Sequence, residues 1–198
     1  MSNLHALPPG CPHAKPFLDC LHPRRALARD NEFGNRMSGH IVIRTALPGD
    51  LGEVRRLLVT TWHDTYDALL GADRVTATTD SWHAIDVLAR QSALPNASFL
   101  IATQCSKLVG HAFAVEEAGG VLLLSRLYVL PSHQRRGIGE SLLAAAVKRH
   151  PGTACVQLIV EARNTKGLAF YGRHGFVVIG EIEEEGSKPL RLQMVVGA

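Results

Sequence analysis

A short polar stretch with two arginines and two glycines lies between an apolar run and an alanine-rich segment. In "YVLPSHQRRGIGESLLAAA", residues 128–146, Arg135 and Arg136 come directly before Gly137 and Gly139 is close behind. The first turn of a helix carries free backbone N–H groups and a partial positive charge, so it binds phosphate oxygens. Glycines let a ligand approach the backbone, and arginines add charged hydrogen-bond donors. This arrangement predicts a loop that binds a phosphate-containing compound.

Two common nucleotide-binding motifs do not fit this stretch. A Rossmann motif needs a third glycine three residues after the second, where this sequence has Leu142. A P-loop needs Gly-Lys followed by Ser or Thr, and the sequence contains no such tripeptide. The phosphate compound is therefore expected to be of another kind.

The stretch "VLPSHQRRGIG" with the Ala/Leu helix after it resembles the Q/R-x-x-G-x-G/A motif of the GCN5-related N-acetyltransferases, the GNAT family. In that family the motif binds the diphosphate of acetyl-coenzyme A (acetyl-CoA). A second segment, "EARNTKGLAFYGRHGF" at residues 161–176, is similar to the family's second motif, in which an Asn begins a helix and a Tyr precedes a Gly-Phe turn. The resemblance covers about residues 40–198. It implies the acyl-CoA N-acyltransferase fold and direct transfer of acetyl from acetyl-CoA to a primary amine.

The resemblance also implies which residues contact acetyl-CoA. Backbone groups of Leu127, Tyr128 and Val129 would bind the pantetheine arm and the thioester carbonyl. Asn164 would contact the cofactor from the other side of the cleft. Glu140 departs from the family pattern, which often has a small or basic residue there, and we expect its carboxylate to point away from the phosphates. The residues expected around the diphosphate are Gln134, Arg135, Arg136, Gly137, Ile138, Gly139 and Glu140.

Transfer to an amine needs a proton acceptor and a proton donor. A protonated amine cannot attack a thioester, so near pH 7 a carboxylate must take its proton, directly or through water. Glu161 ends a predicted strand beside the second motif and is the candidate base. The resemblance implies that Tyr171 protonates the departing thiolate and that a backbone N–H near Val129 stabilises the oxyanion. Other side chains that could act as the base are Glu116, Glu117, Asp64 and His111.

Two aromatic residues, Trp62 and Tyr66, lie one turn apart on a predicted helix. Pockets are commonly lined by aromatic side chains, so both are candidates to bind the acceptor, although the same spacing fits core packing. His63 and Asp64 could bind a polar acceptor beside them. The acceptor could be a small amine, an amino acid, an antibiotic, or a protein N-terminus or lysine.

Hydrophobic periodicity predicts the elements that hold these residues in place. The order β-α-α-α-β-β-β-α-β-α-β-β indicates an α/β (α+β) fold with a mixed, mostly antiparallel sheet of about seven strands flanked by helices. A strand-helix-strand unit around Gly137 implies one parallel pair of strands, where we expect the sheet to open. Strands are predicted over 41–46, 98–103, 108–115, 121–130, 154–161, 176–182 and 190–196. Helices are predicted over 50–71 with Asp50 as N-cap, from about 80 with Trp82, Ile85 and Leu88 on the apolar side, over 137–150 and over 164–174.

Composition limits the cell compartment and the partners. The formal charge of +3 over 198 residues is too small to favour nucleic acid, and no apolar run approaches the roughly 18 residues of a membrane span. Four cysteines without a regular framework favour a reducing cytoplasm. The predicted partners are therefore a small-molecule or protein amine, with no nucleic acid and no membrane.

The first 38 residues contain five of the ten prolines and no sustained periodicity. We expect a poorly ordered extension over 1–38 and an N-acetyltransferase domain over 39–198, with Met37 as a possible second start of translation. No metal is predicted, because the spacing of Cys11, His13, Cys20 and His22 departs from that of zinc sites. The extension could mediate a homodimer or bind a partner.

Two other functions are compatible with the same loop of arginines and glycines. One is a non-catalytic module that binds or senses acyl-CoA, and the other is transfer of a longer acyl group.

Overall fold

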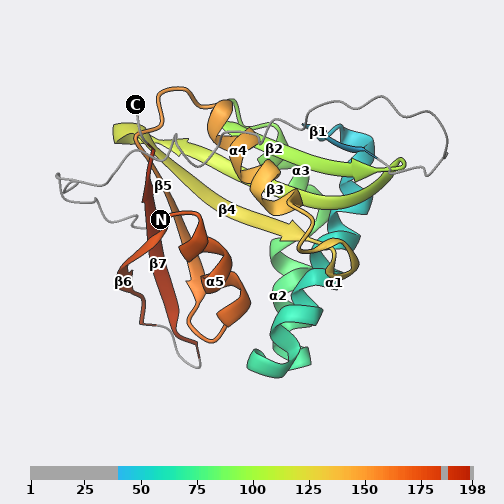
Figure 1. The fold of residues 1–198 in the computed structure, drawn as a ribbon. Helices are drawn as coiled ribbons and strands as arrows, with labels where there is room; N and C mark the ends of the chain where they lie inside the picture. Colours follow the sequence, from blue (N-terminus) through green and yellow to red (C-terminus); the bar gives the residue numbers. More distant parts are fainter. Residues whose placement is uncertain (1–39, 184–186, 197–198) are drawn as a thin grey trace, which may run out of the picture.

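The computed structural model describes residues 40–183 and 187–196, so the predictions made for residues 1–38 lie outside the described residues. Figure 1 shows one seven-stranded sheet with helices around it, and the strand order is β1-β2-β3-β4-β5-β7-β6. The predicted mixed, mostly antiparallel sheet is confirmed. The strands are β1 (Ile41–Thr45), β2 (Ala97–Gln104), β3 (Lys107–Glu117), β4 (Val121–Val129), β5 (Cys155–Glu161), β6 (Val177–Glu181) and β7 (Pro189–Val195). The helices are α1 (Leu51–Leu70), α2 (Ala72–Trp82), α3 (Ile85–Ser92), α4 (Ile138–Lys148) and α5 (Thr165–Arg173).

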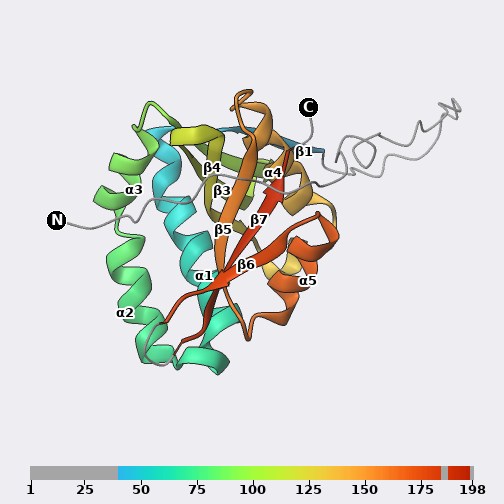
Figure 2. The ribbon, with the colours of Figure 1, turned by 90° about the vertical axis from the view of Figure 1, so that its left-hand side faces the viewer.

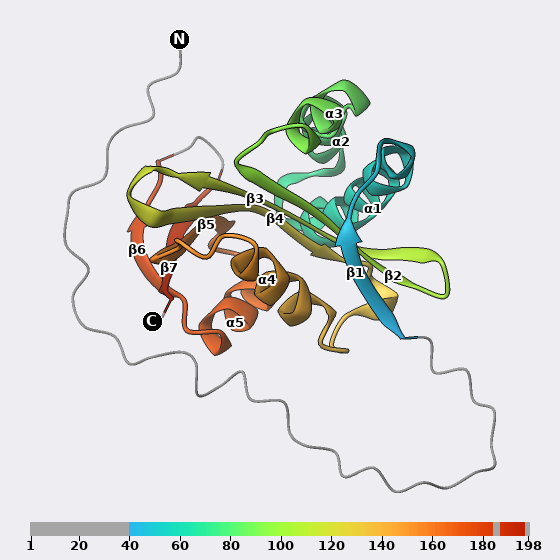
Figure 3. The same ribbon diagram turned by 90° about the horizontal axis from the view of Figure 1, so that it is seen from above.

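Helices cover both faces of the sheet. Figures 2 and 3 show α1, α2 and α3 on one face and α4 and α5 on the other. Each face has its own hydrophobic cluster, one built around Leu142 of α4 and the other around Leu58 of α1. At Gly110 of β3 an added Cβ would lie 3.0 Å from Leu142 and 3.2 Å from Ile138, so a glycine there lets α4 approach the strand closely. The described residues include no helix long and apolar enough to cross a membrane.

The sheet opens between its one parallel pair of strands, β4 and β5. Only three residue pairs join them, from Val121 with Cys155 to Leu123 with Gln157. Both strands then continue, to Val129 and Glu161, without pairing further with each other, and Figure 1 shows them diverging. A register shift between β3 and β4 leaves Ser125 as a bulge residue, which strengthens the local twist. The opening predicted for the parallel pair is confirmed.

Two local predictions were wrong. The chain turns at His83, so α2 ends at Trp82 and α3 begins at Ile85; these two residues are exposed, and of the predicted apolar side only Leu88 is buried. Asp50 does not cap α1, because its carboxylate accepts hydrogen bonds from Arg44, at 2.6 and 2.9 Å, and from the Leu47 amide at 2.6 Å. At Asp50 the competing contacts with Arg44 and Leu47 take the place of the cap.

Candidate functional site

The chain's three tyrosines lie together beside the opening of the sheet. Tyr66 comes from α1, Tyr128 from the end of β4 that does not pair with β5, and Tyr171 from α5. Burial raises the pKa of each hydroxyl, and the nearby Tyr66 hydroxyl raises the pKa of the other two further. All three hydroxyls therefore stay protonated at neutral pH and can donate a hydrogen bond.

Trp62 packs at the centre of an aromatic group next to these tyrosines. Its ring centroid lies 4.9 Å from that of Tyr66, 5.9 Å from Trp82, 5.4 Å from His83 and 6.5 Å from Tyr128. Among the described residues its buried indole N–H makes no hydrogen bond of regular geometry, but its approach to the Tyr128 hydroxyl lowers the pKa of that hydroxyl, which burial raises more strongly. The two aromatic residues predicted for the acceptor site therefore lie beside the strand predicted to bind the thioester, and Trp82 extends the same surface. Sequence reasoning placed Trp82 on the wrong side of its helix and so missed it.

Asn164 joins α5 to α1 across the opening. Its side-chain oxygen accepts a hydrogen bond from the Gly167 amide at 2.9 Å, which caps α5 as the sequence predicts. Its side-chain nitrogen donates to the Tyr66 hydroxyl oxygen at 3.3 Å. The asparagine thereby fixes the start of α5 relative to the aromatic face of α1.

The Glu161 carboxylate is buried and is held by the hairpin between β6 and β7. It accepts hydrogen bonds from Arg163 Nε at 2.8 Å, the Arg163 amide at 3.3 Å, Ser187 Oγ at 2.7 Å and the Lys188 amide at 2.9 Å. Burial raises the pKa of this carboxyl, but the hydrogen bonds from Arg163, Lys188 and Ser187 together outweigh burial and lower it to about 2. A carboxylate with so low a pKa is a weak proton acceptor near pH 7. Its contacts favour a positioning role, and the predicted base role stays a prediction.

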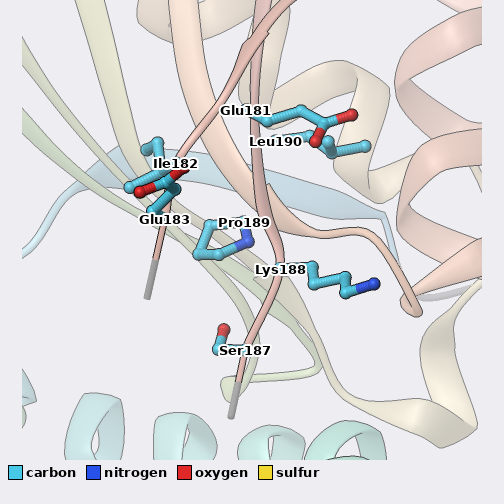
Figure 4. A pocket seen from close by; sticks show the side chains of 7 residues that line it. All are labelled: Glu181, Ile182, Glu183, Ser187, Lys188, Pro189 and Leu190. Atoms are coloured by element: carbon cyan, nitrogen blue, oxygen red, sulfur yellow. The ribbon is translucent and has the colours of Figure 1, made fainter. Parts of the chain in front are cut away.

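A cavity of about 460 Å³ borders this hairpin (Figure 4). Ser187 and Lys188 line the cavity and also hold Glu161, so the cavity lies next to the opening of the sheet. Two carboxylates, Glu181 and Glu183, make part of its wall negative. Its lining consists of Glu181, Ile182, Glu183, Ser187, Lys188, Pro189 and Leu190. Local sequence patterns could not predict that this hairpin contacts Glu161, because Ser187 is 26 residues from Glu161 along the chain.

The loop before α4 has the features of an anion site. Gly137 has φ +78° and nothing within 4 Å of an added Cβ, and no side chain caps the helix. Arg135 also has a positive φ of 62°, and both arginines of the loop are exposed. Gln134 donates from Nε2 to the Val129 carbonyl at 3.1 Å, which ties the loop to the end of β4. Free first-turn amides, an open glycine and two exposed guanidinium groups fit a phosphate-bearing ligand.

Two residues of this loop and helix have contacts that the motif did not predict. A Cβ at Gly139 would lie 3.3 Å from the Phe170 ring, so this glycine also lets α4 and α5 pack closely. The Glu140 carboxylate lies 3.9 Å from His174 Nε2 on α5, so the side chain points toward that helix. Neither contact blocks the amides at the start of α4.

The structure argues against two of the alternative bases. His111 is fully buried, its Nδ1 lies 2.9 Å from the Leu100 carbonyl oxygen, and burial together with Arg126 lowers its pKa to about 3. Glu116 is near the opposite end of β3 from Gly110, where its carboxylate lies 3.2 Å from His150 Nδ1. Asp64 is exposed on α1, and Glu117 is exposed at the end of β3.

Comparison with known proteins shows that this chain is similar to acetyltransferases. Residues 95–178 match the family model of the acetyltransferase (GNAT) domain. The chain is 34% identical to the mycothiol acetyltransferase of Acidimicrobium ferrooxidans over 49% of this chain and 34% of that protein. It is 30% identical to the peptidyl-lysine N-acetyltransferase YiaC of Escherichia coli over 50% of this chain and 62% of that protein. The chain thus spans between about a third and three fifths of these curated relatives.

The fold also matches a solved structure, the PaiA N-acetyltransferase from Thermoplasma acidophilum in complex with coenzyme A. The TM-score is 0.72 at 23% identity, and the match covers 79% of this chain and 99% of that chain. This match covers a larger share of the chain than residues 95–178, which the family model matches.

Proposed function

Because residues 95–178 match the family model of the acetyltransferase (GNAT) domain, we propose that this chain transfers the acetyl group of acetyl-CoA to a primary amine. The observation that carries this proposal is the divergence of β4 and β5 beside the uncapped start of α4. Unpaired backbone groups of β4 and a phosphate-binding helix terminus then border one opening.

The residues that would hold acetyl-CoA follow from this arrangement. The amides of Ile138 and Gly139, together with Arg135 and Arg136, would bind the diphosphate. The free edge of β4 from Leu127 to Val129 would bind the pantetheine arm through its backbone groups. Asn164 would approach from the α5 side, where it already orders the helix start.

Acetyl-CoA supplies an activated thioester carbonyl and a thiolate leaving group. The Tyr171 hydroxyl keeps its proton at neutral pH, because burial raises its pKa, so it can stabilise the departing thiolate by donating a hydrogen bond. The raised pKa disfavours complete transfer of that proton, and the acid role stays a prediction. Glu161 is already ionised and fully hydrogen-bonded, so we assign it the task of positioning the β6–β7 hairpin. The acceptor amine must then reach the site neutral or lose its proton through water.

We propose that the acceptor approaches between α1 and the β6–β7 hairpin. Trp62 and Tyr66 would contact it from one side, and the cavity beside Ser187 would receive it on the other. Amines are cations in neutral solution, and the Glu181 and Glu183 carboxylates would attract them. These features suit an amine-bearing acceptor, small or peptidyl, without choosing between the two.

The first experiment is calorimetric titration of the full chain with acetyl-CoA, coenzyme A and NADH in parallel. We expect the two coenzyme A compounds to bind and NADH not to bind, because the loop lacks the Rossmann glycine. Binding of none of them, or of NADH alone, would contradict the proposed cofactor.

The second experiment measures thiol release from acetyl-CoA in the presence of small amines, amino acids and lysine peptides. Amine-dependent thiol release is the expected result. Tight binding of acetyl-CoA with no release from any acceptor would instead favour a sensing module. Faster release from longer acyl-CoA esters would favour a different acyl group.

A further inference from the structure

The strand β6 forms one edge of the sheet and is exposed along its whole length. It pairs with β7 on one side, and no strand of the described residues pairs with its other side. Its first three residues, Val177, Val178 and Ile179, are 62%, 54% and 43% exposed. An edge strand carries unpaired N–H and C=O groups that can bind a further strand. β6 therefore offers both main-chain hydrogen bonds and apolar side chains to a partner.

The sheet face beside this edge has no helix over it. Gln157 Nε2 donates to Gln193 Oε1 at 2.8 Å, and Val177 is opposite Gln193, so these three side chains lie on one face. Ile159 is two residues after Gln157, lies on the same face and is 54% exposed. The helices α4 and α5 cover the other face, where Leu158 is buried. Figure 2 shows β5, β7 and β6 from their uncovered side.

Exposed apolar side chains are concentrated at this edge. Of the nine large hydrophobic side chains that are exposed in the described residues, four are on β5 and β6. Exposed hydrophobic residues that occur singly are normal, whereas a group of them marks an interaction site. We call this group the β6 surface, and it consists of Ile159, Val177, Val178 and Ile179.

The other edge strand, β1, has a charge in its middle. Arg44 of β1 pairs with Asp50 at 2.6 Å, and a charged residue on an edge strand opposes pairing with another chain. The only charged residue of β6 is its last one, Glu181. The apolar part of β6 therefore lacks this protection.

The charges at the two ends of β6 have opposite signs. Arg173 at the end of α5 comes shortly before β6 and is exposed, whereas Glu181 and Glu183 are exposed at its other end. Within the described part of the chain, none of these three side chains has an ion-pair partner. In an antiparallel pair of β6 strands, the basic start of one strand lies near the acidic end of the other. In a parallel pair, like charges would meet, so the charges favour the antiparallel arrangement.

We propose that a second copy of this chain docks on the β6 surface, with the two β6 strands antiparallel and related by a twofold axis. This is the symmetry of most homodimers, in which the same surface of both copies forms the interface. The two seven-stranded sheets would then join into one. β6 is separated from the opening between β4 and β5 by β7 and β5, so the proposal does not depend on the proposed acetyl transfer.

The interface is small. β6 has five residues, and its register against β7 shifts between Val178 and Gly180, so only a short strand pair can form. Small interfaces are usually weak, and we expect a dimer Kd of about 10 μM. The dimer should therefore depend on protein concentration.

The test is sedimentation equilibrium of the full chain at concentrations from about 1 to 100 μM, a range that spans the expected Kd. One chain has a mass of 21.5 kDa, and the average mass should rise from this value toward twice this value.

A charge on β6 should prevent the association. Val178→Glu would place two like charges close to the twofold axis and should weaken the dimer at least about tenfold. Val42→Glu is the matched control, because Val42 is 53% exposed on the other edge strand, β1, and this change should leave the dimer Kd as it is. Circular dichroism of both variants reports whether they fold.

Charge reversal tests the antiparallel arrangement. Arg173→Glu should weaken the dimer at least about threefold, because each of the two symmetric contacts loses an attraction between exposed charges. Adding Glu183→Arg to the same chain reverses both charges and should restore most of the affinity.

Three results would overturn the proposal. If the mass stays at that of one chain up to about 100 μM, no second copy binds the β6 surface at the expected affinity. If Val178→Glu associates as the wild type does, the dimer uses another surface. If Glu183→Arg does not restore the affinity that Arg173→Glu removes, the antiparallel arrangement is wrong.

Discussion

Replacing Glu161 with glutamine distinguishes a positioning carboxylate from a catalytic base. The wild-type side chain accepts four hydrogen bonds, from Arg163 twice, Ser187 and Lys188. Glutamine keeps the shape of the side chain but removes its charge. Its NH₂ group would also face the N–H and O–H donors that the carboxylate oxygens accept from in the wild type. We expect the β6–β7 hairpin to lose much of its anchorage.

The size of the effect follows from the pKa of the carboxyl. A fall from 4.5 to about 2 on folding corresponds to about 3 kcal/mol of stability at pH 7. The actual loss should be about 2 to 3 kcal/mol, because Arg163 is 45% exposed and solvent screens its ion pair. A carboxyl whose pKa is lowered on folding stabilises the fold at pH values above its unfolded-state pKa of 4.5. This stabilisation disappears as the pH falls toward 2, the pKa in the folded protein. At pH 3 about 1 kcal/mol should remain.

Urea unfolding of the wild type and Glu161→Gln, followed by circular dichroism at pH 7 and pH 3, measures this difference. Glu53→Gln is the matched control, because Glu53 is 54% exposed, lies 3.6 Å from Arg56 and should cost less than about 0.5 kcal/mol. A loss no larger than that of the control, or one that is equal at both pH values, would refute the reasoning.

The same variant tests the base role by kinetics. Removing a general base typically lowers kcat by about 10²–10⁴ and changes the shape of the pH profile. For a positioning residue we expect the free energy of unfolding to fall while the shape of the pH profile stays the same. A large kcat loss with unchanged stability would restore Glu161 as the base.

Three further predictions concern the opening between β4 and β5. Gly137→Ala and Gly137→Asp should each lower the free energy of unfolding by about 1 kcal/mol, because φ of this residue is +78°. Only the aspartate should lower the affinity for acetyl-CoA more than about tenfold, because its charge repels the phosphates. Equal affinities of the two variants in calorimetry would contradict the proposed diphosphate loop. Tyr171→Phe should lower kcat about 100-fold and leave the Kd of acetyl-CoA unchanged, and an unchanged rate of thiol release would remove its acid role. Glu161 titrates near pH 2, His83 and His111 titrate near pH 3, and the tyrosines titrate above their usual pKa. None of these groups changes charge near neutral pH, so kcat/KM should rise with pH toward the pKa of the acceptor amine. An inflection near about pH 6 that stays in place when the amine is changed would identify another base.

Local sequence patterns were sufficient where the structure depends on neighbours along the chain. Asn164 caps α5 as predicted, because capping needs only a side-chain oxygen and an amide three residues later. The parallel pair of β4 and β5 followed from one strand-helix-strand unit, and its opening followed from the parallel pair. The same local reasoning failed for α2 and α3, where the chain breaks at His83 within a stretch of mixed polarity.

The sequence by itself determined the order of the strands and helices, the glycine and arginine loop at the start of α4, and the chemistry that such a loop serves. Only the tertiary structure decided how the named side chains behave. It joins Tyr66, Tyr128 and Tyr171 from three distant elements, and it surrounds Glu161 with donors that lie 26 and 27 residues further along the chain. Helical and strand periodicity reports contacts between near neighbours, whereas burial, hydrogen bonding and pKa depend on groups that only folding brings within a few ångströms.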